Sequence, residues 1–255
     1  MDLQGKIVVI TGAAHGIGKG MATRFAADGA RVICADIDET GAEAVAQDIG
    51  GHSFKCDVAD EHEIQAMIES VESSIGPIDL FCANAGILTL GGLDVPDAHW
   101  DRIWKINVMS HVWTARHLVP RMIARGGGYI LITASAAGLL NQPGAAPYGV
   151  TKHAAVGFAE WLALTYADKG IRVSVLCPQA VRSEMTKGFE DSVAAIDGML
   201  EPEDVAQACV EAIGAESFLV LPHPQVLDYM RLKTADYDRW ISGMNKLNQQ
   251  FAGDT

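Results

Sequence analysis

Tyr148 and Lys152 stand at the two ends of a Tyr-x-x-x-Lys run. On a helix this spacing places both side chains on one face, with their Cβ atoms roughly 5–6 Å apart. A free tyrosine has a pKa of about 10 and is a poor base at neutral pH. Because a nearby ammonium favours the phenolate, the pair predicts a general acid/base that exchanges a proton with a hydroxyl group. Taken alone, the pair also fits an ordinary helix surface.

A glycine-rich turn follows the first apolar run, residues 6–11, and directly precedes a helical pattern. Its Gly12, Gly16 and Gly18 allow a tight turn and a close approach of the backbone to a pyrophosphate. The N-terminus of the next helix adds free N–H groups and a partial charge of roughly +0.5. This order of strand, turn and helix predicts a dinucleotide site, to which His15 and Ile17 also belong.

Asp36 follows the second apolar run, residues 31–35. Alone it would also fit an ordinary turn acid, but a carboxylate in this place accepts hydrogen bonds from both ribose hydroxyls of a dinucleotide. It repels the extra phosphate of NADP, since two unit charges about 4 Å apart at an effective dielectric near 20 cost about 4 kcal/mol. No Lys or Arg follows to reverse this, and His15 occupies the place of a possible fixed cation. The sequence therefore predicts NAD, with Ile37 beside Asp36 in the site.

Short β-rich runs alternate with helical stretches along the chain. Such alternation means parallel strands joined by right-handed crossovers, and predicts an α/β doubly wound parallel sheet (Rossmann fold) of about seven strands with helices on both faces. The expected strands are residues 6–11, 31–35, 53–56, 78–82, 129–133, 172–176 and 217–221. The expected helices are residues 16–29, a stretch ending near 49, 61–75, 97–124 with a break near Pro120, 146–169 and 202–213.

The pattern predicts a single catalytic domain over residues 1–222, which holds the NAD site. Residues 183–199 are less regular and are expected to form a mobile lid over the substrate. Residues 223–255 are read as a helical C-terminal extension of the same domain, with Trp240, Met244 and Leu247 on one stripe.

Composition excludes several function classes. The chain has 255 residues, 49 % of them hydrophobic, and a net charge of −13, which argues against a nucleic-acid partner. No apolar stretch approaches the roughly 18 residues that span a bilayer, and the N-terminus lacks the pattern of a signal peptide, so we expect no membrane partner and a cytoplasmic location. The five cysteines form no CxxC pair and are expected to be buried thiols, and the eight histidines show no metal spacing, so no metal site is expected.

Four motifs occur in order along the chain: the glycine turn, Asn84-Ala85-Gly86, the Tyr-x-x-x-Lys run and Pro178. With them the chain resembles the short-chain dehydrogenase/reductase family over roughly residues 4–222. Ser135 stands thirteen residues before Tyr148, which is that family's separation. The resemblance implies further cofactor residues, namely Asp57 and Val58 by the adenine, Asn84, Ala85 and Gly86 along the cleft, and Pro178, Val181 and Ser183 at the nicotinamide.

The resemblance also implies the reaction, a reversible hydride transfer between NAD and a secondary alcohol or its ketone. Tyr148 would exchange the hydroxyl proton, Ser135 would hold the substrate oxygen, and Asn107 would order a water that relays the proton through Lys152, which also binds the nicotinamide ribose. Two alternatives stay open: the same fold used for a non-redox reaction, and a non-catalytic NAD-binding sensor. The complete Ser, Tyr and Lys set argues against a sensor.

Two departures from the family pattern concern the substrate side. Gln179 stands where the family has glycine after the proline, and Pro222-His223-Pro224 replaces a glycine-rich turn after the last strand. With Ser135, the residues Leu88, Gln179 and Met185 are expected to border the substrate, as are Leu139, Leu140 and Met199. These apolar side chains predict an apolar alicyclic, aromatic or medium-chain alcohol.

In this family the two long helices commonly pack between subunits. The resemblance therefore implies a homotetramer or a homodimer, with Trp161 in the contact.

Overall fold

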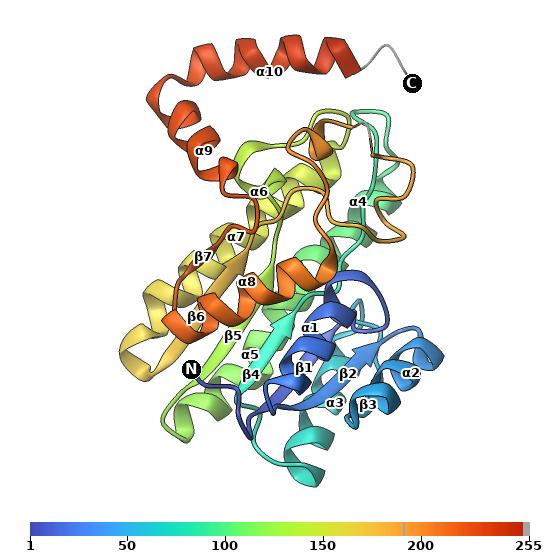
Figure 1. Ribbon diagram of the computed structural model, residues 1–255, viewed down its shortest axis with the longest axis vertical. Coiled ribbons are helices and arrows are strands. Elements are labelled where there is room, and N and C mark those ends of the chain that lie inside the picture. The colour runs from blue at the N-terminus through green and yellow to red at the C-terminus, as the bar shows by residue number, and fades with distance from the viewer. Residues whose placement is uncertain (191, 252–255) are drawn as a thin grey trace.

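The computed structural model describes residues 1–190 and 192–251. Within these residues seven parallel strands form one sheet in the order β3-β2-β1-β4-β5-β6-β7 (Figure 1). The strands are β1 (Ile7–Thr11), β2 (Arg31–Asp36), β3 (His52–Lys55), β4 (Leu80–Ala83), β5 (Gly128–Thr133), β6 (Ile171–Leu176) and β7 (Leu219–Val220). The chain reverses its direction of winding between β3 and β4, so the doubly wound Rossmann sheet predicted from the alternation is confirmed.

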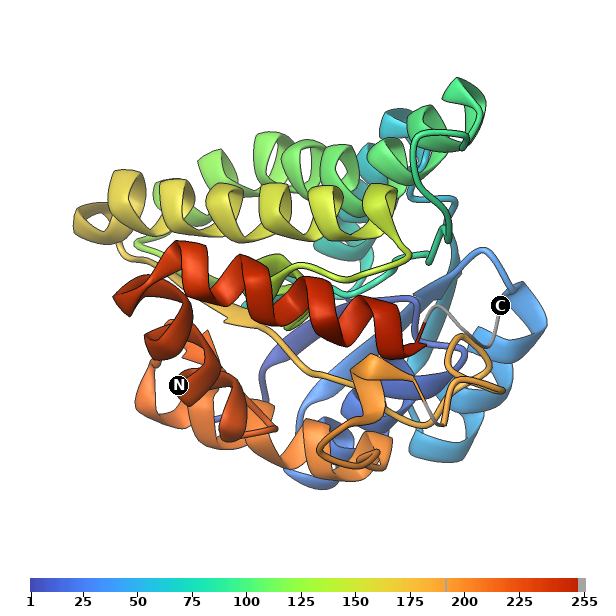
Figure 2. The same ribbon diagram turned by 90° about the horizontal axis from the view of Figure 1, so that it is seen from above.

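Helices cover both faces of the sheet, as Figure 2 shows. The central strands are buried on both faces, which is why they read as continuous apolar runs. One face carries α1 (Gly16–Ala27), α2 (Glu39–Ile49) and α8 (Pro202–Ala215). The other carries α3 (Glu61–Ser74), α5 (Ser110–Ala124) and α7 (Ala146–Tyr166). All five cysteines are free and buried, as predicted.

The helical stretch before β5 differs from its prediction. It consists of α4 (Asp97–Trp104), a π-helical turn η1 (Lys105–Met109) and α5, and Pro120 lies inside α5 without ending it. The expected break near Pro120 is therefore wrong, and the irregularity lies at η1, which contains Asn107. A π-turn admits one extra residue per turn and occurs frequently at functional sites.

Two short elements border the carboxyl ends of the strands: α6 (Ala137–Leu140) after β5 and the 3-10 turn η3 (Val193–Ala195) within the expected lid. A second 3-10 turn, η2 (Ala167–Lys169), joins α7 to β6 at the opposite end of the sheet. The parallel strands bring the loops after β1, β2, β4, β5 and β6 to one edge, where such sheets place their ligands.

After β7 the chain forms α9 (Gln225–Ala235) and α10 (Tyr237–Phe251), so a helical C-terminal extension is present as expected. Val226 of α9 is fully buried against Ala136 and Leu140 of the α6 region. From α9 the chain turns, and α10 runs across the end of the molecule at which the strands finish (Figure 1).

Candidate active site

Two adjoining cavities lie at the carboxyl edge of the sheet. One, of about 400 Å³, is bordered by the glycine turn and is called here the glycine-turn cavity. The other, of about 510 Å³, is lined largely by apolar side chains and is called the apolar cavity. They share Ser135, Tyr148, Gln179, Met185 and Thr186 in their walls, so the expected general acid/base Tyr148 lies at the junction.

The glycine-turn cavity gathers residues from the carboxyl ends of six strands, β1 to β6. With one exception, the residues predicted to bind the cofactor line it: Gly12, His15, Gly16, Ile17, Asp36, Ile37, Asp57, Val58, Asn84, Ala85, Gly86, Tyr148, Lys152, Pro178, Val181 and Ser183. The exception is Gly18. A Cβ there would overlap the Gly12 carbonyl oxygen, so Gly18 is needed to pack α1 against the turn rather than to face the cavity.

Thr11 and Asn84 fix the floor of the glycine turn. The Thr11 hydroxyl accepts hydrogen bonds from the backbone N–H groups of Asn84 (3.0 Å) and Ala85 (3.1 Å). The Asn84 side chain donates to the Thr11 carbonyl (3.0 Å) and accepts from the Thr133 hydroxyl (3.0 Å). Sequence reasoning missed both threonines, because each ends an apolar strand and shows no motif of its own.

Both oxygens of the Asp36 carboxylate are oriented by the backbone. One accepts from the Ala14 N–H and the other from the Asp38 N–H, each at 3.0 Å. His15 places its Nε2 2.9 Å from the Asp38 carboxylate. Hydrogen bonds from the Gly41 backbone and from His15 lower the pKa of Asp38. His15 is therefore paired with an acid beside the cavity, and Asp36 is held with its charge at the cavity wall.

Tyr148 and Lys152 lie in the first half of α7, as their spacing predicts. The Lys152 ammonium donates to the Thr133 carbonyl (2.9 Å) and lies 5.6 Å from the centre of the Tyr148 ring. Complete burial lowers the pKa of Lys152 to about 8. Burial also raises the pKa of Tyr148, and hydrogen bonding with the Ser135 hydroxyl opposes that shift. The sequence argument expected Lys152 to lower the pKa of Tyr148, but in the protein alone desolvation is the larger effect.

Asn107 lies in the π-turn with its side chain fully buried. Its Oδ1 accepts from the Ile87 N–H, and its Nδ2 donates to the Ile87 carbonyl, both at 2.9 Å. Nδ2 also lies 3.3 Å from the Thr151 hydroxyl on α7. The side chain thus ties the loop after β4 to the catalytic helix, while its part in a water relay stays a prediction.

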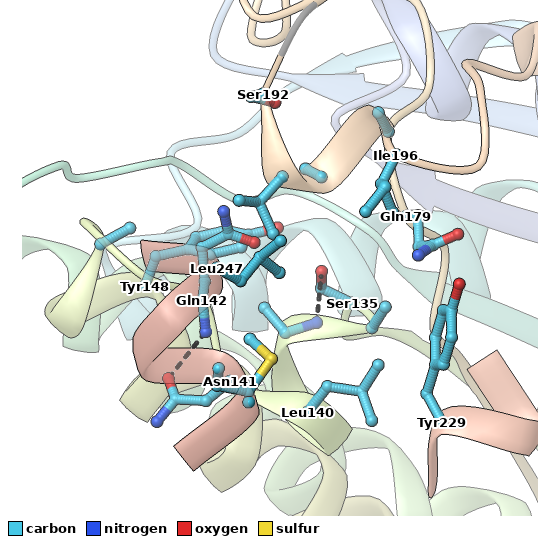
Figure 3. Close-up of a pocket in the computed structure, with 18 of the residues that line it drawn as sticks. Ser135, Leu140, Asn141, Gln142, Tyr148, Gln179, Ser192, Ile196, Tyr229 and Leu247 are labelled. Atoms are coloured by element: carbon cyan, nitrogen blue, oxygen red, sulfur yellow. Dashed lines mark hydrogen bonds between the residues drawn. The ribbon is translucent and has the colours of Figure 1, made fainter. Parts of the chain in front are cut away.

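The apolar cavity opens from Ser135 and Tyr148 toward the C-terminal extension (Figure 3). Of the residues expected at the substrate, Leu88, Leu140, Gln179 and Met185 line it, whereas Leu139 and Met199 do not. Leu139 packs into the hydrophobic core instead. Residues of the expected lid, Phe189 and Val193 among them, border the cavity, and their mobility stays a prediction.

The C-terminal extension supplies one wall of the apolar cavity, which the sequence did not reveal. The wall consists of Tyr229 and Leu232 on α9 and of Trp240, Met244 and Leu247 on α10. The last three are the stripe recognised in the sequence, whose spacing marks an apolar helix face but does not say what the face covers.

Among the described residues, no helix is long and apolar enough to cross a membrane. In the same part of the chain, no three His, Cys, Asp or Glu side chains converge as a metal site would require.

The sequence profile of the short chain dehydrogenase family matches residues 6–194, a span that contains the glycine turn, Ser135, Tyr148 and Lys152. The chain belongs to this family. The short-chain dehydrogenase is 32 % identical over 252 residues to 1-deoxy-11-beta-hydroxypentalenate dehydrogenase of Streptomyces exfoliatus, an alignment that covers 95 % of this chain and 92 % of that protein. It is 31 % identical over 239 residues to human epidermal retinol dehydrogenase 2, covering 90 % of this chain and 77 % of the relative.

A solved structure resembles this short-chain dehydrogenase over nearly its whole length. It is a short chain dehydrogenase/reductase from Burkholderia phymatum in complex with NAD, with a TM-score of 0.85 and 27 % identity. The superposition covers 93 % of this chain and 96 % of that one. The similarity therefore extends past the strand–helix core into the C-terminal part of the chain.

Proposed function

We propose that the protein transfers a hydride reversibly between NAD and a secondary alcohol or its ketone, with Tyr148 as the general acid/base. The observation that carries this proposal is the junction of the two cavities at Ser135 and Tyr148, with Lys152 in the wall of the glycine-turn cavity. A dinucleotide in one cavity and an alcohol in the other would meet at the tyrosine hydroxyl. The two curated relatives named above are dehydrogenases, which supports the reaction class.

The residues of the glycine-turn cavity fit NAD. A Cβ at Gly86 would lie 3.3 Å from both Asn107 Oδ1 and Lys152 Nζ, so glycine keeps open the space beside the lysine. At the far end, the oriented Asp36 carboxylate suits two ribose hydroxyls and opposes a phosphate. The NAD complex of the Burkholderia phymatum structure supports the same cofactor. When bound, NAD supplies the carbon that accepts or returns the hydride.

In the direction of ketone reduction, Tyr148 is prepared as an acid. Because burial raises its pKa, the hydroxyl keeps its proton at neutral pH and donates it to the substrate oxygen, which the Ser135 hydroxyl orients. In the direction of oxidation, Tyr148 takes the alcohol proton, and the Lys152 ammonium stabilises the resulting phenolate. We propose that Asn107 orders a water through which Lys152 exchanges the proton with solvent.

The substrate is proposed to be an apolar molecule of substantial size, because a cavity of about 510 Å³ is bordered by Leu88, Leu140, Trp240 and Leu247. An alicyclic or aromatic skeleton with one secondary hydroxyl fills such a space and leaves few polar groups to satisfy.

Tyr148→Phe tests the reaction. The variant should bind NAD like the wild type and lose oxidation of a panel of secondary alcohols, followed by reduced-nicotinamide absorbance with NAD and with NADP. Tyr237→Phe, which removes the hydroxyl of an exposed tyrosine on α10, is the matched control. Full activity of Tyr148→Phe would refute the mechanism. NAD binding without turnover of any alcohol would instead favour a sensor or a non-redox reaction.

We also propose that the protein forms a homodimer or a homotetramer through α7. This helix exposes Val150, Trp161 and Leu164 on one face, with 51 % of Trp161 and 86 % of Leu164 accessible. Trp161→Glu should shift the species seen by analytical ultracentrifugation to the monomer, and an unchanged mass would exclude this face.

A further inference from the structure

The two departures from the family pattern meet in space. The backbone N–H of Gln179 donates to Nδ1 of His223 at 3.2 Å, and the His223 side chain is almost completely buried. Because Nδ1 accepts, Nε2 carries the ring proton. Beside this pair, the Tyr229 hydroxyl of α9 donates to Oδ1 of Asp197 at 3.0 Å. The loop after β6, the expected lid, the turn after β7 and α9 thus share one polar cluster.

This cluster has unused hydrogen-bonding capacity. Among the described residues, six buried side-chain polar atoms find no hydrogen-bond partner. Four of the six belong to this region: Gln179 Oε1, Ser192 Oγ, Asp197 Oδ2 and His223 Nε2. Buried polar atoms are nearly always paired, so such a concentration indicates that a further polar group belongs there.

The polar cluster reaches the apolar cavity, where Gln179, Ser192 and Tyr229 are lining residues. Figure 3 shows Tyr229 and Gln179 on the side of the cavity away from Tyr148. The wall between them is apolar, with Leu140 and Ile196 in it. A molecule that occupies the cavity therefore meets a catalytic end, an apolar middle and a second polar end.

Donors and acceptors are both present at this second end, since His223 Nε2–H and the Gln179 amide N–H groups can donate. Gln179 Oε1 and Asp197 Oδ2 can only accept hydrogen bonds. The Tyr229 hydroxyl already donates its hydrogen to Asp197, so its oxygen can only accept a further bond. A carboxylate placed there would face the charge of Asp197 and would bring further acceptors. A hydroxyl group fits, because it both donates to an acceptor such as Gln179 Oε1 and accepts from an N–H donor.

We propose that Gln179 and Tyr229 bind a second hydroxyl group of the substrate, at the side of the apolar cavity that lies away from Tyr148. This inference rests on the proposed function, whose substrate class it narrows to diols and hydroxyketones on a rigid apolar skeleton. Gln179 acts as a specificity-determining residue, and its replacement of glycine supplies a side chain that the backbone bond to His223 holds in place.

Two alcohols that differ by one group test the proposal: bicyclohexyl-4,4'-diol and 4-cyclohexylcyclohexanol. The wild type should oxidise the diol with a kcat/KM about tenfold higher, the effect of one well-made hydrogen bond. In Gln179→Met, which keeps the backbone bond to His223, this ratio should fall to about one, whatever the change in the two individual constants. Tyr229→Phe should lower the ratio likewise. Gln65→Met and Tyr237→Phe, on exposed helix surfaces, serve as controls.

A wild-type ratio near one, a ratio that survives in Gln179→Met, or a preference for the analogue with a carboxylate in place of the distal hydroxyl would overturn the proposal. Thermal shifts of the NADH-bound protein separate this failure from failure of the proposed reaction. If neither alcohol is oxidised but the diol stabilises the wild type more than Gln179→Met, the hydroxyl site stands and the reaction is wrong. If the monoalcohol is oxidised and the diol gains nothing, the reaction stands and the hydroxyl site is wrong.

Discussion

Replacing Gly18 with alanine tests the packing of the nucleotide end. An added Cβ would overlap the Gly12 carbonyl oxygen and would lie 2.7 Å from the Gly12 carbonyl carbon and 2.8 Å from Asn84 Nδ2. Real Cβ atoms essentially never approach other heavy atoms within 3.0 Å, so the turn or α1 must move. Overpacking costs about 1–3 kcal/mol, and the upper end applies because backbone must give way. We expect Gly18→Ala to lose about 3 kcal/mol of unfolding free energy and to bind NAD at least about tenfold more weakly.

Urea unfolding followed by circular dichroism measures the first effect, and fluorescence titration with NAD measures the second. Gly214→Ala is the matched control, since this glycine is also helical and a Cβ there meets nothing within 4 Å. It should be stabilised by up to about 1 kcal/mol, because alanine is the better helix former. If Gly18→Ala unfolds within about 0.5 kcal/mol of the wild type and binds NAD equally well, the packing argument is wrong.

Four further outcomes follow from the site. Asp36→Ala should move the NAD-to-NADP ratio of kcat/KM toward NADP by about ten- to a hundredfold, because one repulsive charge at the ribose is lost; an unchanged ratio would exclude that role. Burial lowers the pKa of Lys152 to about 8 from 10.5, so between these values the unfolded chain binds the extra proton and stability rises with pH. In urea titrations without cofactor, the wild type should therefore gain about 3 kcal/mol relative to Lys152→Met between pH 8 and pH 10.5; parallel pH curves would contradict this. Asn107→Ala leaves the N–H and the carbonyl of Ile87 without their hydrogen bonds, so it should lower the free energy of unfolding in urea by about 2–4 kcal/mol. A negligible change would show that other contacts hold the loop after β4. Trp240→Ala should raise KM for 4-cyclohexylcyclohexanol about tenfold and leave KM for NAD unchanged, because Trp240 lines only the apolar cavity. An equal rise in both KM values would contradict this.

The alternation of strands and helices predicted the fold, whereas Asp57 and Asn84 were assigned to the nucleotide end by the family resemblance. In a parallel sheet the carboxyl ends of successive strands meet at one edge, so residues placed after strands are placed near one another. Asp36, Asp57 and Asn84 each follow a different strand, yet all three line one cavity. The strand–turn–helix order and the Tyr-x-x-x-Lys spacing therefore predict residues that the fold brings to the same edge of the sheet.

The remaining features depend on contacts between distant segments, which periodicity does not encode. The spacing of Trp240, Met244 and Leu247 predicts an apolar helix face. Which surface this face covers depends on the direction in which the chain leaves β7, and in the structure it covers the apolar cavity. Likewise, Gln179 and His223 are two separate departures from the family pattern in the sequence, and only the fold brings them into hydrogen-bonding contact. The π-turn at Asn107 was missed in favour of Pro120, because proline is the visible helix breaker and a π-turn has no comparably visible residue signature.

The wall formed by α9 and α10 follows the last strand and belongs to none of the strand–helix units that hold the nucleotide end. Part of the apolar cavity is therefore encoded after the last strand, apart from the segments that carry Ser135, Tyr148 and Lys152. Substitutions in the final two helices can therefore reshape the apolar cavity without touching Ser135, Tyr148 and Lys152. For the protein engineer, residues 225–251 form a natural unit for transplantation between members of the family, and the measure of success is a changed alcohol profile at constant affinity for NAD.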